Sequence, residues 1–203
     1  MPSDAKHRAS GAARHDVRGS LKFALSALAA GTVGLASVTA AIDGSIGGIS
    51  ESLGQWKIWP LAGAAGADPY TRAHFTAQDR LPPNSFEVQE YETAVDSDGR
   101  SLDSSCTYRL AGHMPPTRWW SVWAMASGPN PDQQPVGVTS NDVVYDAEGQ
   151  VLIAFSPTPQ TGQWIRLNDY GGFSVIMRLY NPAVNFRRNA KQEPLPVLAR
   201  VSC

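Results

Sequence analysis

The feature that most constrains this chain is an uncharged run of twenty residues near its N-terminus, FALSALAAGTVGLASVTAAI, residues 23–42. A helix rises about 1.5 Å per residue, so this run just crosses a hydrocarbon core of about 30 Å. No polar face appears at helical spacing, which argues against a surface helix of a soluble domain. The run predicts a single membrane-spanning helix.

Basic residues outnumber acidic ones in the segment before this run. The basic residues are Lys6, Arg8, Arg14, Arg18 and Lys22, and the acidic ones are Asp4 and Asp16. A basic flank keeps the N-terminus in the cytoplasm and sends the following chain across the membrane. We therefore expect a single-pass protein of the inner membrane whose C-terminal domain lies on the periplasmic side.

A cleaved signal peptide is the alternative interpretation of this run. Val38 and Ala40 are small residues that suit cleavage before Ala41. The apolar part of a cleavable signal is usually shorter, about 7 to 15 residues, which favours a retained anchor. Small residues four positions apart are typical of helix association in lipid, so a homo-oligomer is one expected state. These pairs are Ala27/Gly31 and Ala30/Gly34.

The chain divides into four expected parts. They are a basic tail (1–22), the anchor (23–42), a flexible Gly/Ser-rich linker (43–55) and an exported domain (56–203). Within the exported domain, Asp68 and Pro69 have the residue types of a helix N-cap and first helical position. A short helix should therefore run from there to about Gln78.

After this helix the pattern is that of strands. Gly (18) and Pro (15) are frequent, and apolar and polar residues alternate between turns. The expected strands are 86–96, 102–111, 118–127, 142–146, 150–156, 172–180 and 196–202. Two turns, VDSDGRSL and YDAEGQVL, share an acid-x-acid-Gly pattern that suits a tight return. Seven short strands of this kind indicate a mainly β fold, an antiparallel β-sandwich or a jelly roll.

The two cysteines fit an exported domain. Cys106 lies within an expected strand and Cys203 is the last residue. One disulfide is the simplest interpretation, with Cα atoms about 5 to 6 Å apart and a closed loop of about 97 residues. Two separate buried thiols are the alternative.

Charge and motifs argue against several classes of protein. A formal net charge of −1 gives no field to attract nucleic acid. No phosphate-binding loop, nucleophile elbow, zinc-protease or dinucleotide motif occurs, so we expect no cofactor. We also expect no metal site: His74 and His113 should be solvated or capped, and the acids near residue 100 should form a plain hairpin turn. Those acids are Asp96, Asp98 and Asp103.

Aromatic and arginine side chains are the remaining candidates for a binding site. In PPTRWWSVWAMAS, alternation puts Trp119 and Trp123 on one strand face and Trp120 on the other, and both faces cannot be equally exposed. We therefore expect a polar-aromatic set that could line a groove for a sugar or an acid. Its members are Arg118, Trp120, Trp164, Arg178 and Tyr180. The alternative is that the tryptophans close the sandwich ends while the arginines pair with nearby acids.

The stretch GGFSVIMRLY bears on this choice. Four apolar residues at period two predict its core face: Phe173, Val175, Met177 and Leu179. Ile176 then shares the opposite face with Arg178 and Tyr180, so that face should be only partly exposed to solvent. Gly171 and Gly172 would let Trp164 or a ligand approach closely. We expect Arg178 to point away from the core and to pair with an acid of the same domain rather than to be kept free for a ligand.

Six motifs in order carry a resemblance to a known family. They are ADPYTRA, DSDGRSLDSSCTYRLAG, PPTRWWSVWAM, TSNDVVYDAEGQVLIAFSP, GQWIRL and FSVIMRLYNP, and they extend from about Asp68 to Cys203. The series resembles the bacterial domain of unknown function 1214, in a form without the accompanying domain 1254. Gln163 replaces the usual Asn, and Ile176 and Met177 stand where Leu and Thr are common. The resemblance implies a jelly-roll-like sandwich and no established activity.

Three functional hypotheses follow. We expect a membrane-anchored cell-envelope protein whose sandwich binds a ligand, an envelope carbohydrate or a protein partner, without catalysis. An enzyme acting on a sugar or lipid-linked envelope substrate is the alternative, and it would depend on the scattered acids Glu90, Glu92 and Asp169. A structural or assembly protein is the third. Acids gathered with aromatics in a pocket would favour the enzyme, and a covered aromatic face would favour the structural protein.

Overall fold

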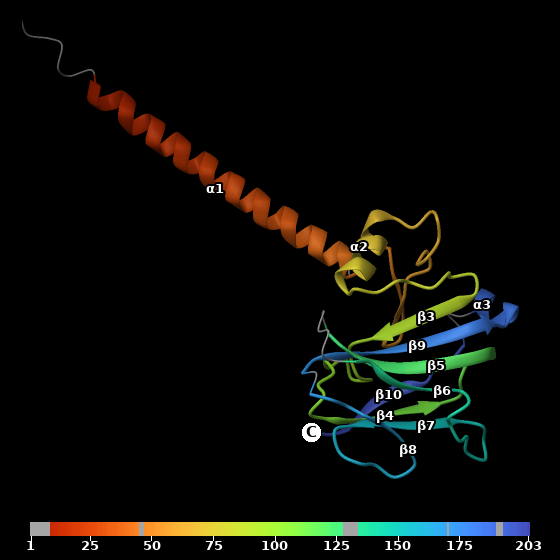
Figure 1. The fold of residues 1–203 in the computed structure, drawn as a ribbon. Helices are drawn as coiled ribbons and strands as arrows, with labels where there is room; N and C mark the ends of the chain where they lie inside the picture. Colours follow the sequence, from red (N-terminus) through yellow and green to blue (C-terminus); the bar gives the residue numbers. More distant parts are fainter. Residues whose placement is uncertain (1–8, 45–46, 128–133, 170, 190–192) are drawn as a thin grey trace, which may run out of the picture.

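The computed structural model describes residues 9–44, 47–127, 134–169, 171–189 and 193–203. Helix α1 (Ala9–Ile42) projects from a domain of two stacked sheets and meets that domain at the short helix α2 (Pro69–Ala77) (Figure 1). The segment Gly19–Ile42 is long and apolar enough to cross a membrane, a property that anchors share with signal sequences. The span expected at 23–42 lies inside it, and residues 1–8 of the expected basic tail lie outside the described part.

The larger sheet has six strands in the order β1-β2-β3-β9-β5-β6, and every neighbouring pair is antiparallel. The strands are β1 (Glu51–Leu53), β2 (Trp56–Ile58), β3 (Val88–Thr93), β9 (Phe173–Pro182), β5 (Thr117–Ala126) and β6 (Val136–Thr139). The linker expected at 43–55 therefore contains β1, which pairs with β2; its residues 45–46 lie outside the described part.

The smaller sheet has four strands in the order β10-β4-β7-β8. They are β10 (Val197–Ser202), β4 (Thr107–Gly112), β7 (Val151–Ser156) and β8 (Gln163–Arg166). The first three are antiparallel, and β8 runs parallel to β7. A third helix, α3 (Val184–Asn189), follows β9.

Side chains from both sheets meet in one core, which makes the fold a β-sandwich as predicted. The core face predicted for β9 is confirmed, because Phe173, Val175, Met177 and Leu179 are all at most 1% exposed. The facing side chains of the smaller sheet are Tyr108, Leu110, Ile153, Phe155 and Leu198. A jelly-roll order of the strands stays a prediction.

Local polar side chains fix the turns. Asp68 caps α2 by accepting hydrogen bonds from the backbone N–H groups of Tyr70 and Thr71, as predicted. In the two acid-rich turns, Asp96 Oδ1 accepts from two backbone N–H groups and Asp146 Oδ1 does the same. These are ordinary Asx-type turns.

One expected strand is absent and four strands were missed. Residues 142–146 form a loop, because Asp142 Oδ2 accepts from the Thr139 N–H and hydroxyl and turns the chain there. Strands β1, β2, β6 and β8 were not predicted. Each has only three or four residues, too few for alternation to give a signal.

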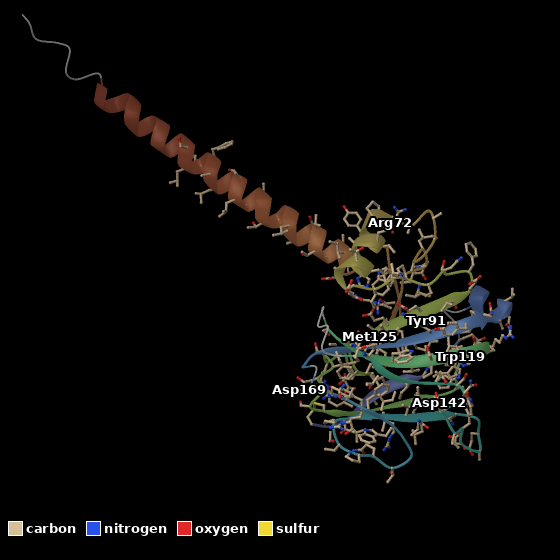
Figure 2. The ribbon with its side chains drawn as sticks, viewed as in Figure 1. Arg72, Tyr91, Trp119, Met125, Asp142 and Asp169 are labelled. Atoms are coloured by element: carbon tan, nitrogen blue, oxygen red, sulfur yellow. A yellow bond between two sulfur atoms is a disulfide. The ribbon has the colours of Figure 1, made fainter. Side chains whose placement is uncertain are left out.

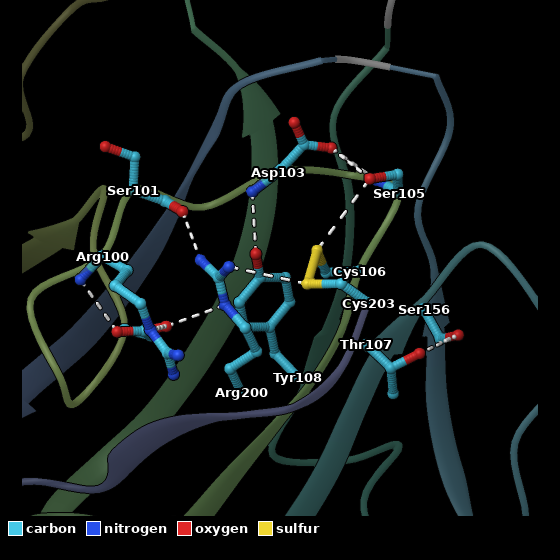
Figure 3. Close-up of a disulfide and its surroundings, with 11 residues drawn as sticks. Arg100, Ser101, Asp103, Ser105, Cys106, Thr107, Tyr108, Ser156, Arg200 and Cys203 are labelled. Atoms are coloured by element: carbon cyan, nitrogen blue, oxygen red, sulfur yellow. Dashed lines mark hydrogen bonds and ion pairs between the residues drawn. A yellow bond between two sulfur atoms is a disulfide. The ribbon is translucent and has the colours of Figure 1, made fainter.

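The disulfide between Cys106 and Cys203 is present and ties the end of β10 to the start of β4 (Figure 3). Its Cα atoms are 4.1 Å apart, closer than the 5 to 6 Å typical of such bonds. Beside it, the Arg200 guanidinium lies 5.3 Å from the Tyr108 ring centroid and pairs with Asp96 at 2.9 Å. The C-terminus is therefore fixed by covalent and ionic contacts together.

Candidate functional site

The candidate site lies on the outer face of the larger sheet, where β3, β9 and β5 are neighbours. The strand register pairs Glu90 with Arg178 and Arg178 with Ser121, which forms a polar row across three strands. In an adjacent row, Trp119 pairs with Tyr180, and their ring centroids are 4.6 Å apart. These side chains alternate with the core residues of the same strands, so they point away from the core, as predicted for Arg178 and Tyr180.

Two arginines and two glutamates form an ionic cluster on this face. Arg178 Nε donates to Glu90 Oε2 at 2.7 Å, which confirms that Arg178 pairs with an acid of its own domain. Arg80, in the segment after α2, donates to Glu90 at 3.2 Å and to Glu92 at 3.0 Å. The side chains of Arg80 and Glu90 are each 7% exposed, and that of Arg178 is 28% exposed. The β9 end of the cluster is thus its solvent-facing end.

His74 of α2 contacts the cluster through Glu92 and lies between the cluster and the end of α1. It is buried, and its ring stacks on Trp59 with centroids 4.0 Å apart, so of the two expected states, solvated or capped, it is not the solvated one. Its Nδ1 lies 3.1 Å from the carbonyl oxygen of Ile42 and its Nε2 lies 3.2 Å from the Gln78 amide. A proton on Nδ1 satisfies the Ile42 carbonyl, and Nε2 also lies 3.8 Å from Glu92 Oε2. The capped alternative is correct, and His113 is exposed between β4 and β5.

Glu92 is the acid of this cluster that lies between Arg80 and His74. Burial alone would raise the pKa of its carboxyl, but the contact with His74 and the charge of Arg80 outweigh that effect. The pKa of Glu92 therefore lies below its ordinary value, and the group is held as a carboxylate. Such a carboxylate is a structural partner of Arg80 and is poorly suited to act as a general acid.

Aromatic side chains flank the exposed end of the cluster. Trp119, Trp123 and Tyr180 are each half-buried on the outer face of β5 and β9. Trp123 lies against β6, where a Cβ at Gly137 would come within 2.6 Å of its ring. Ser121 is buried between the two tryptophans along β5, and its hydroxyl has no hydrogen-bond partner among the described residues.

The structure brings together only part of the predicted polar-aromatic set. Trp120 is 3% exposed in the core, and its Nε1 donates to the Tyr145 hydroxyl. Trp164 is on β8 of the other sheet. Its neighbour Ile165 points into the core, so Trp164 points away from the core, and its Nε1 donates to the Ser156 carbonyl. It therefore does not approach the glycines before β9; a Cβ at Gly171 would meet nothing within 4 Å.

Arg118 is exposed at the start of β5, on the strand face that carries Trp120 farther along. Only Arg178 and Tyr180 of the predicted set lie in the candidate site. The residues that complete the site, and that were not in the set, are Trp119, Ser121, Trp123, Glu90 and Arg80. Alternation had separated Trp119 and Trp123 from Trp120, but it could not show which face was buried.

The acids proposed for catalysis do not form an acid–base pair. Glu90 and Glu92 share Arg80, and Asp169 is exposed in the loop between β8 and β9 (Figure 2). Within the described part of the chain, no group of three or more His, Cys, Asp or Glu side chains could hold a metal ion.

A groove of about 550 Å³ lies at the open side of the sandwich, between the β1–β2 turn, the turn after β3 and the segment before β10. Its main polar groups already have partners in the fold. Trp56 Nε1 donates to the Pro196 carbonyl, and the Gln55 amide bonds the backbone of Leu198. Asp96 is 1% exposed and paired with Arg100 and Arg200. Because few groups remain to orient a ligand, this groove is a weaker candidate than the aromatic face.

Comparison with known proteins places the central part of the chain in a family. No curated protein matches it. An uncharacterized protein from Burkholderia cenocepacia is 17% identical with a TM-score of 0.43, over 59% of this chain and 30% of that one. The VPA0106 protein from Vibrio parahaemolyticus is 20% identical with a TM-score of 0.49, over 68% of this chain and 36% of that one. The chain thus spans about a third of the length of either structure.

The family model described as "Protein of unknown function (DUF1214)" matches residues 87–184, from just before β3 to the start of α3. This range contains β3, β5 and β9, the three strands that carry the candidate site. Over these residues the chain matches the DUF1214 family, as its motifs predicted.

Proposed function

We propose that this protein is a membrane-anchored module of the cell envelope that binds an envelope carbohydrate, without catalysis, on the outer face of the larger sheet. The observation that carries the proposal is the group of half-buried rings, Trp119, Trp123 and Tyr180, around the exposed end of Arg178. Rings of this kind offer a flat apolar surface with a polar edge, which suits the faces of sugar rings.

Polar groups beside the rings would orient such a ligand. Arg178 uses Nε for Glu90, and a guanidinium carries further N–H donors in a fork that matches a carboxylate. The Ser121 hydroxyl next to it is fully buried, so the guanidinium of Arg178 is the polar group that a ligand can reach. An acidic sugar is therefore the ligand class that fits best.

The same arrangement favours binding over chemistry. A glycosidase needs one carboxyl that holds a proton and a second that stays ionised. Glu90 and Glu92 are instead both paired with Arg80, and the pKa of Glu92 is lowered. The outer face therefore supplies recognition groups without a proton donor.

Binding can be tested with soluble N-acetylglucosamine–N-acetylmuramic acid oligosaccharides, using tryptophan fluorescence of the full-length protein in detergent. Trp119→Ala and Arg178→Gln should each weaken binding by about 10-fold, the equivalent of about 1.4 kcal/mol. Trp164→Phe, on the other sheet, is the matched control and should bind as the unmodified protein does. Equal affinity in Trp119→Ala and the unmodified protein would rule out this face.

The anchoring part of the proposal rests on the apolar helix Gly19–Ile42 and the basic residues before it. A reporter that works only in the periplasm should be active when fused after Cys203, and the protein should stay in the membrane fraction after a carbonate wash. Recovery of a soluble, shortened chain that begins at Ala41 would show that the helix is a cleaved signal instead.

A further inference from the structure

We infer that α2 rests on the surface of the bilayer, with the Tyr70 side chain in the lipid headgroup region beside the point where α1 leaves the membrane. The inference rests on the retained anchor proposed above and adds a second, surface contact to it. Three features of the structure carry it: the depth of the end of α1, its attachment to α2 and the composition of the exposed α2 layer.

The charges around the apolar run fix the depth of its C-terminal end. Lys22 and Asp43 bracket twenty uncharged residues, and a helix of that length spans about 30 Å. With Lys22 at one interface, Ile42 and Asp43 lie at the other. Any part of the domain that contacts the backbone of Ile42 or Asp43 is therefore at headgroup level.

Side chains of the domain hold this end of α1. His74 Nδ1 lies 3.1 Å from the Ile42 carbonyl oxygen, and Lys57 Nζ donates to the Asp43 carbonyl at 3.1 Å. The Ser50 hydroxyl donates to the Gly44 carbonyl at 2.7 Å. Helix α2 thus lies within one side chain's length of the membrane exit, between α1 and β3 in Figure 1.

The α2 face that meets α1 also carries Tyr70. Residues four apart lie on one face of a helix, so Tyr70 is one turn before His74 on the side that touches Ile42. Ala77, three residues after His74, continues this side. Tyr70 is 41% exposed. Tyrosine is enriched at membrane interfaces because its ring is apolar and its hydroxyl is polar and can be hydrated.

The exposed surface of this layer is unusually poor in charge. In residues 59–77 the acids and bases besides His74 are Asp68 and Arg72. Asp68 is occupied by the N-cap of α2, which leaves Arg72 as the exposed charge, suited to a lipid phosphate. Leu61 in the preceding loop is 50% exposed. A surface facing only water would carry more charge, whereas this composition fits a lipid interface.

The test uses the full-length protein in nanodiscs of phosphatidylcholine with a minority of phosphatidylglycerol. Both cysteines are in the disulfide, so one introduced cysteine takes an environment-sensitive fluorophore selectively. The label is placed at Tyr70→Cys, with Ala73→Cys as a second position on α2. Val38→Cys lies in the proposed span and is the reference for a label inside the membrane. Leu152→Cys, 50% exposed on β7, is the reference for a label in water.

We expect a lipid-borne quencher to reduce emission at Tyr70→Cys by at least about half as much as at Val38→Cys, and to leave Leu152→Cys unchanged. Quenching at position 38, with positions 70 and 73 behaving like 152, would overturn the surface contact and leave the anchor standing. Absence of quenching at position 38 would overturn the anchor and this inference with it. The outcomes for the two proposals are therefore distinguishable.

Discussion

Arg178 on β9 donates to Glu90 on β3 at 2.7 Å across paired strands, on the sheet face opposite the core. Arg80 completes the cluster by bridging Glu90 to Glu92. The segment after α2 is thereby held to the sheet by charge pairing, while the aromatic half of the same face is left to solvent. Variants of Arg80 should therefore change stability, whereas variants of Trp119 should change the proposed binding.

Arg80→Ala should lower the free energy of unfolding by about 3 to 5 kcal/mol, because two nearly buried carboxylates lose their common partner. Arg178→Ala should cost about 1 to 2 kcal/mol, since its pair is partly exposed and Glu90 keeps Arg80. Chemical denaturation in detergent, followed by tryptophan fluorescence, measures both. Equal losses in the two variants would contradict the shared role of Arg80.

Phe173→Ala should destabilise the domain by about 3 to 5 kcal/mol, because the ring is 1% exposed and its removal leaves a cavity between the sheets. Phe86→Ala is the matched control: that ring is 74% exposed, and its loss should change stability by less than about 0.5 kcal/mol. The same denaturation assay gives both values. A small effect at Phe173 would mean that the two sheets are not closely packed there.

The domain should lose stability in acid. Burial alone would raise the pKa of Asp96, but two backbone N–H groups and the charges of Arg100 and Arg200 outweigh it and hold this pKa below its ordinary value. A carboxyl with a lowered folded-state pKa stabilises the fold above its unfolded pKa, about 3.9 for Asp. This stabilisation disappears as the pH falls through the folded-state pKa.

The denaturant concentration at the midpoint of unfolding should therefore decrease when the pH is lowered below about 4. Glu92, whose pKa is also lowered in the fold, should add to this loss of stability. Asp96→Asn removes one titrating group. Its stability deficit relative to the unmodified protein should be largest near neutral pH and should shrink as the pH is lowered. A deficit that stays constant with pH would show that Asp96 is not held ionised by these contacts.

Removing the disulfide should destabilise the domain by up to about 4 to 5 kcal/mol, because it closes a loop with a sequence separation of 97 residues. The double variant Cys106→Ser/Cys203→Ser and the reduced protein should agree, since both lose the same constraint. Denaturation with and without a thiol reductant measures the effect. A reductant that lowers the stability of the double variant equally would point to a cause other than this bond.

The periodic parts of the fold were predictable from sequence. Phe173 and the apolar residues at period two identified the core face of β9, and Asp68 with Pro69 identified the start of α2. The pairing of Cys106 with Cys203 followed from the count of two cysteines in an exported chain. In each case the signal was local or had a single alternative.

The site was only partly predictable, for physical reasons. Alternation divides the residues of β5 between two faces but gives no sign of which face meets the second sheet, so Trp120 was chosen where Trp119 and Trp123 belong. Trp164 was misplaced because nothing local shows that β8 joins the other sheet, parallel to β7. Three of the partners of His74, namely Ile42, Trp59 and Glu92, are distant in sequence.

The side-chain bonds along β10 have a consequence for crowding in the membrane plane. β10 is an outer strand of its sheet, yet Trp56, Gln55 and the Ser97 N–H occupy backbone groups of Pro196 and Leu198. Unpaired strand edges invite another chain to add a strand, which leads to swapping and aggregation. The proposed anchor would confine copies of the domain to two dimensions and make such encounters frequent. With the backbone groups of Leu198 occupied by the chain's own residues, this part of the edge offers a neighbouring copy no place to add a strand.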